Sequence, residues 1–201
     1  MHTVPVGSLE TLLETLDYRR PAAAAHSRRV AVFARHLAVI MGLQSDEMAT
    51  LVQAALVHEA GALVGRPEKA TDLPGFQIWC GLSDDVDDVL WYATRRFDHH
   101  RHAPPAARLL AVAHAFDELT TAREYHVPLS PESARMAIAR EAGRRFCPMA
   151  VNVLVAARLE HCEAVDVGGV VARPDGPASG DADRLRGSRR LTIDYRFVTI
   201  S

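Results

Sequence analysis

Lysine is almost absent from this sequence, and no charge of one sign dominates it. Lys69 is the single lysine among 23 basic residues, which are balanced by 25 acidic ones to a net charge of −2. A charge so close to neutral gives no bulk electrostatic attraction to nucleic acid or to an anionic membrane. The sequence therefore predicts neither a nucleic-acid partner nor a membrane partner.

Cysteine and long apolar runs are also scarce. The three cysteines, Cys80, Cys147 and Cys162, are scattered and show no CxxC spacing. This excludes a disulfide framework and favours a reducing cytoplasm. No signal-peptide core opens the chain, and no apolar run reaches the roughly 18 residues that a membrane span needs. We therefore expect a soluble, cytoplasmic protein, with 201 residues that are 48% hydrophobic and suffice for one compact core.

Histidine, in contrast, is abundant. Seven of the ten histidines lie between His26 and His114. The stretch 51–62, LVQAALVHEAGA, predicts the end of a helix with an apolar face. His58 and Glu59 lie at the end of that face, just before Gly61. Burial of such groups is costly unless they are paired or bind a metal, although a helix that frays into water would also accommodate them.

Helical periodicity and helix-start signals cover most of residues 8–161. His26 lies on an apolar face with Val30, Phe33 and Leu37, where a hydrogen-bonded core histidine is the ordinary explanation. Ser83 followed by several aspartates is a typical first turn. Residues 63–82, rich in proline and glycine, predict an irregular loop. The expected helices are 8–16, 21–41, 45 to about 60, 83 to about 96, 105–122, 131–143 and 148 to about 161.

The composition changes after Val165. Residues 165–190 are rich in glycine, proline, aspartate and arginine and predict a flexible tail. The final LTIDYRFVTI alternates apolar and polar residues as a β-strand does. We expect a helical domain over 1–164 and a tail over 165–201. A lone strand needs a partner, which a second copy in a homodimer would supply, as would a missing part of a longer protein.

Four segments resemble the HD-GYP branch of the HD superfamily. They are HSRRV at 26–30, ALVHEAG at 55–61, LLAVAHAFDELTTAREY at 109–125 and EAGRRFCPMAV at 141–151. The resemblance covers roughly residues 17–160, and the 32 residues from His26 to His58 (58 − 26) also suit the family. It implies an all-α helical bundle, the HD-domain fold, whose ligands converge on buried metal ions that bind phosphate. Usual substrates of the branch are cyclic di-GMP or its linear product.

The resemblance also implies a set of site residues. His26, His58, Glu59 and His114 would bind one divalent ion such as zinc, iron, manganese or nickel, with His58 and Glu59 as the catalytic pair. His99 and His100 would contribute to a second site if the paired histidines of the family are matched by residue type. A second register, based on 96–98, places Ala93 and Thr94 at those positions instead.

Several positions depart from the family pattern. Glu59 replaces an aspartate, Ala62 replaces a lysine that would help to hold phosphate, and His114 replaces an aspartate. The GYP loop and the family's middle histidine have no counterpart. The chain therefore resembles a degenerate member of the branch.

Two functions are consistent with these residues. The first is a metal-dependent phosphohydrolase that acts on a phosphate-containing small molecule, such as a cyclic dinucleotide or a phosphomonoester. The second is a catalytically inactive regulatory module that binds a cyclic dinucleotide or a partner protein, because several lost site residues together would slow hydrolysis greatly. A third and weaker interpretation is a fragment of a transcription regulator, whose short arginine-rich 184–190 segment does not support DNA binding.

Overall fold

Helices account for the regular structure of this computed structural model, which describes residues 9–60, 83–122 and 127–157. Within those ranges no strand forms beyond a single bridge between Ala142 and Phe146. The predicted all-α fold is confirmed. The helices are α1 (Leu9–Arg19), α2 (Pro21–Met41), α3 (Ser45–Val57), α5 (Asp84–Ala93), α6 (Pro105–Thr120), α7 (Pro131–Ala139) and α8 (Pro148–Ala156).

Proline and glycine set many of the helix ends. Four helices begin with a proline, whose missing N–H and fixed φ suit the first turn. Gly42 ends α2 in the left-handed conformation, with φ of 77°. Before α3, Gln44 and Glu47 form a reciprocal capping box, so the N-cap is one residue earlier than Ser45.

Helix α5 is shorter than the sequence predicts, ending at Ala93 rather than near Arg96. The next residues bond to a distant loop instead of extending the helix. The N–H groups of Phe97 and Asp98 donate to the carbonyls of Arg145 and Arg144, at 3.1 and 2.9 Å. This tertiary pairing fixes the position of the segment that follows α5.

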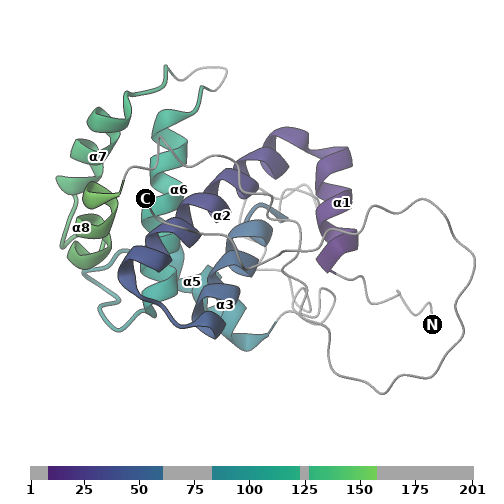
Figure 1. Ribbon diagram of the computed structural model, residues 1–201, viewed down its shortest axis with the longest axis horizontal. Coiled ribbons are helices and arrows are strands. Elements are labelled where there is room, and N and C mark those ends of the chain that lie inside the picture. The colour runs from purple at the N-terminus through teal and green to yellow at the C-terminus, as the bar shows by residue number, and fades with distance from the viewer. Residues whose placement is uncertain (1–8, 61–82, 123–126, 158–201) are drawn as a thin grey trace, which may run out of the picture.

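Helix α6 lies at the centre of the bundle. It packs against α2, α3, α5, α7 and α8. Helices α7 and α8 lie together at one end of the molecule, and α1 covers the opposite end of α2 (Figure 1). Residues carried by α2, α3 and α6 are therefore brought close although they lie far apart in sequence.

Small side chains allow these three helices to approach closely. All three helices bury alanines, whose small side chains allow neighbouring backbones to approach closely. They are Ala31, Ala34 and Ala38 of α2, Ala54 and Ala55 of α3, and Ala113 of α6. Larger core residues, such as Leu37 and Phe116, fill the remaining space.

Some sequence predictions fall outside the described residues. These are the loop 63–82, the boundary near 164, the tail after 165 and the final strand. Within the described residues, no helix combines the length and apolar character that a membrane crossing requires.

We expect Leu37→Ala to lower the free energy of unfolding by about 2–5 kcal/mol, because it leaves a cavity in the core. Leu37 is 0% exposed, whereas Ile40 on the same helix is 46% exposed. The matched control Ile40→Ala should therefore change stability by less than about 1 kcal/mol. Urea unfolding followed by circular dichroism measures both, and equal losses would contradict the packing described above.

Candidate metal centre

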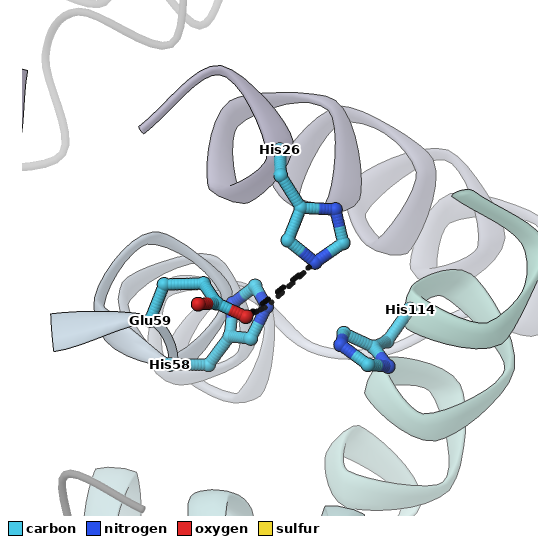
Figure 2. A group of neighbouring side chains, drawn as sticks. All are labelled: His26, His58, Glu59 and His114. Atoms are coloured by element: carbon cyan, nitrogen blue, oxygen red, sulfur yellow. Dashed lines mark hydrogen bonds and ion pairs between the residues drawn. The ribbon is translucent and has the colours of Figure 1, made fainter. Parts of the chain in front are cut away.

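Three imidazoles and a carboxylate converge between α2, α3 and α6. His26 projects from α2, His58 and Glu59 directly follow α3, and His114 projects from α6 (Figure 2). One ligand atom from each residue lies within 4.8 Å of the others. The three rings are 5.0 Å apart, centroid to centroid, in every pair. The structure thus brings together the four residues that the sequence analysis had grouped; their function as ligands remains a prediction.

The His26 ring is fixed by a buried carboxylate. His26 Nδ1 lies 2.6 Å from Oδ2 of Asp117, which is 0% exposed. Arg29 donates to both oxygens of Asp117, at 2.6 and 3.0 Å. Burial would raise the pKa of Asp117, but the hydrogen bonds from His26 and Arg29 outweigh it and bring the pKa to about 2. Asp117 is therefore a charged acceptor that ties α6 to α2.

The sequence analysis missed this function of Asp117. The signal was present, because Asp117 follows His114 by three residues and Arg29 follows His26 by three. Residues at that spacing share a helix face. Because α2 and α6 each carry such a pair, the sequence predicts that Arg29 and Asp117 lie next to the site histidines and support them.

The His58 ring is fixed by the main chain. Its Nδ1 lies 2.7 Å from the carbonyl oxygen of Ala55, one turn earlier in α3. Burial, followed by the nearby His114 and His26, lowers the pKa of His58 to about 4, against the opposing effect of the Ala55 carbonyl. His58 is therefore neutral near pH 7, which is the form that binds a metal.

These contacts determine which ring nitrogens face the centre. With Nδ1 directed at Asp117 in His26, and at Ala55 in His58, both rings turn Nε2 toward the centre. The two Nε2 atoms face each other at 3.2 Å. Two nitrogen ligands at about 2.0–2.1 Å from a tetrahedral ion lie about 3.3 Å apart. The spacing of this pair therefore fits a shared cation.

Glu59 completes the group from the solvent side. Its Oε1 lies 3.7 Å from His58 Nε2 and 3.8 Å from His26 Nε2, and its side chain is 33% exposed. His114 Nδ1 lies 3.5 Å from Oε2 of Glu118, one helical turn away. The donor set of three nitrogens and one oxygen suits zinc and related divalent transition metals.

His99 and His100 are not part of this group. His99 is 69% exposed and faces Asp98, at 3.8 Å. The His100 ring packs edge-on against Trp91, with centroids 5.2 Å apart. Both lie in the turn after α5, whose main chain pairs with the loop at 144–145. Among the described residues, neither histidine belongs to a group of three or more potential metal ligands, and their contribution to a second site stays a prediction.

The alternative register puts the family's paired ligand positions at Ala93 and Thr94, which line a cavity. A cavity of about 480 Å³ lies beside the cluster, and Ala93 and Thr94 line it together with His58 and His114. Neither Ala93 nor Thr94 offers a strong metal ligand. Among the described residues, therefore, a single cluster of potential ligands is present. The remaining lining residues are Leu90, Arg95, Arg96, Leu110, Ala111, Arg145 and Phe146.

Comparisons with known proteins agree with the motifs. No protein-family model matches the chain. The chain is 27% identical over 179 residues to 3'3'-cGAMP-specific phosphodiesterase 2 of Vibrio cholerae, covering 75% of this chain and 33% of that protein. It is 24% identical over 182 residues to the cyclic di-GMP phosphodiesterase response regulator RpfG of Xanthomonas campestris, covering 76% and 48%.

These relatives support the resemblance to the HD-GYP branch. The similarity to both proteins, at low identity, supports an HD-superfamily, phosphohydrolase-like domain. It spans between a third and a half of the length of these two curated relatives.

Because Asp117 orients His26, we expect Asp117→Asn to weaken zinc binding about 10- to 100-fold. The amide has no negative charge and pairs less strongly with His26 and Arg29. Asp98→Asn is the matched control, because Asp98 pairs with Arg96 outside the cluster. Competition with a chromophoric chelator measures both affinities. Equal affinity in Asp117→Asn and the wild type would show that Asp117 does not support the centre.

Proposed function

We propose that this chain holds one divalent transition-metal ion at His26, His58, Glu59 and His114. We further propose that it acts as a phosphohydrolase-like domain that takes a cyclic dinucleotide into the adjacent cavity. The observation that carries this proposal is the convergence of four potential ligand atoms within 4.8 Å. The names of the two relatives, both phosphodiesterases of cyclic dinucleotides, support the class of ligand.

The cavity suits a phosphate-bearing small molecule. Its volume of about 480 Å³ lies within the roughly 300–1,000 Å³ usual for small-molecule sites. His58 and His114 line one part, and Arg95, Arg96 and Arg145 bring positive charge to it. Leu90, Leu110 and Phe146 supply apolar surface on which the remainder of a nucleotide can pack.

The ligand geometry bears on catalysis. When bound, a divalent ion supplies Lewis acidity toward a phosphoryl oxygen. Catalytic zinc sites keep three protein ligands and an open position, whereas structural sites use four. The three histidines are tied in place by contacts with Asp117, Ala55 and Glu118. Glu59 is the one carboxylate of the four, so we assign it the exchangeable position, where it accepts a proton from attacking water.

A second candidate function is ligand binding without turnover. The observation that favours it is the single ligand cluster among the described residues, which offer no second group of ligands for an ion that would clamp the phosphate from another side. Ala62 also supplies no positive charge where the family has lysine. We accordingly propose that cyclic di-GMP hydrolysis is slow or absent while binding is retained.

The test combines metal analysis of the purified protein with hydrolysis assays on bis(p-nitrophenyl) phosphate and cyclic di-GMP. We expect about one equivalent of metal per chain, with weak or no cyclic di-GMP turnover. Fast turnover that is lost in His58→Ala would establish a competent phosphodiesterase and contradict the binding-only function. Absence of metal from protein reconstituted with zinc, iron and manganese would reject the metal centre.

His58→Ala should abolish metal uptake and the stabilisation that comes with it. At free zinc about 100 times the dissociation constant, the wild type should gain about 2.7 kcal/mol of unfolding free energy by mass action. His99→Ala is the matched control, because His99 is exposed and lies outside the cluster. Thermal unfolding with and without zinc measures the gain. The same zinc-dependent shift in His58→Ala would contradict the assignment.

The substitution Glu59→Gln tests whether Glu59 acts mainly as a metal ligand or as the group that accepts a proton from water. The amide keeps the shape of the side chain but cannot accept a proton from water near neutral pH. If Glu59 occupies the exchangeable position, zinc affinity should fall less than tenfold, while any hydrolysis of bis(p-nitrophenyl) phosphate should fall at least 100-fold. Parallel zinc titration and kinetics check this. A fall in zinc affinity as large as that of His58→Ala would instead make Glu59 an essential ligand.

A further inference from the structure

One wall of the cavity is basic and lies apart from the histidines. Arg95 and Arg145 line the cavity of about 480 Å³ and also a neighbouring hollow of about 20 Å³. His58 and His114 line the larger cavity but not the smaller one. The two arginines therefore stand where the hollows meet, on a different part of the cavity wall from the candidate metal ligands.

Arg96, the third arginine of the cavity, is already engaged by a carboxylate. It donates to both oxygens of Asp98, at 3.1 and 2.6 Å. In the described part of the chain, neither Arg95 nor Arg145 has a carboxylate oxygen within 4.0 Å of its guanidinium. A ligand anion can therefore neutralise the positive charges of Arg95 and Arg145, the two arginines of this wall that no carboxylate pairs with in the described part of the chain.

Aromatic rings hold both guanidinium groups. The Arg95 guanidinium carbon lies 4.2 Å from the centroid of the Trp91 ring, and that of Arg145 lies 5.0 Å from the Phe146 ring. Stacking restrains a guanidinium while its N–H groups, which lie in its plane, stay available to acceptors. One of these donors, Nη1 of Arg95, reaches Thr94 Oγ1 at 3.2 Å.

The two arginine-bearing segments are also fastened to each other. The Phe97 N–H donates to the Arg145 carbonyl, and the Asp98 N–H donates to the Arg144 carbonyl. Gly143, with φ of 80°, closes the loop by donating to the Phe146 carbonyl at 2.8 Å. A fixed pair of arginines loses little conformational entropy when it binds an anion.

We infer that Arg95 and Arg145 form a phosphate-binding locus separate from the histidine cluster. A ligand that spans the cavity places one phosphate at the histidines and a second phosphate oxyanion at these arginines. The locus supplies positive charge in a chain where Ala62 stands in place of the family's lysine. The inference rests on the proposed function in one respect, because the proposed metal centre binds the first phosphate.

The test measures cyclic di-GMP binding by calorimetry to full-length protein reconstituted with zinc. Arg145→Gln and Arg95→Gln should each weaken binding about tenfold, because each removes a charge-assisted hydrogen bond to phosphate. Arg144→Gln is the matched control, since Arg144 is an exposed neighbour that lines neither hollow. Zinc content should be unchanged in all three variants. Cyclic GMP, with one phosphate, should bind the wild type more weakly than cyclic di-GMP.

The outcomes separate this inference from the proposed function. Equal cyclic di-GMP affinity in Arg145→Gln, Arg95→Gln and Arg144→Gln would overturn the arginine locus even if zinc binding were intact. No measurable cyclic di-GMP binding to the wild type would also overturn it. In His58→Ala, which tests the metal centre, residual cyclic di-GMP binding that falls further on adding Arg145→Gln would support the locus without the metal.

Discussion

A buried carboxylate, Asp117, is the constraint on which the site depends. It is fully enclosed, and its charge is kept by hydrogen bonds from His26 and Arg29 despite the cost of burial. Those bonds join α6 to α2 and turn His26 so that Nε2 faces His58. An unpaired carboxylate at this position would destabilise the bundle, so the same contacts support both the fold and the site.

The close packing of α2, α3 and α6 provides the second condition. Three imidazoles that start on three helices meet 5.0 Å apart because buried alanines keep the helix backbones close. His58 is held by the last turn of α3, and Glu59 follows it directly. Helix packing thus brings together nitrogen donors that lie far apart along the chain, and it leaves Glu59 and His114 more exposed than His26 and His58.

Sequence patterns predicted the helices well where local signals are strong. Proline at the first position of α2, α6, α7 and α8, and Gly42 after α2, mark ends that the structure reproduces. The end of α5 was wrong by three residues, because main-chain bonds from Phe97 and Asp98 to a distant loop override local propensity. No local pattern carries that information.

For the site, the sequence predicted that His26, His58, Glu59 and His114 lie together. It did not predict where His99 and His100 lie. His99 and His100 match the family by residue type, but they lie outside this cluster and His99 is exposed, which spacing alone could not show. Asp117 and the arginines of the cavity wall went unrecognised. Their significance depends on partners brought together by tertiary structure, such as Arg29 for Asp117 and Arg145 for Arg95.

The central claim is that the three imidazoles share one metal ion. X-ray absorption spectroscopy at the zinc edge of the loaded protein tests this claim most directly. We expect a four-coordinate ion with three imidazole nitrogens at about 2.0–2.1 Å and one oxygen. A spectrum with fewer than two imidazole ligands, or one unchanged by replacing His26, His58 or His114, would contradict it.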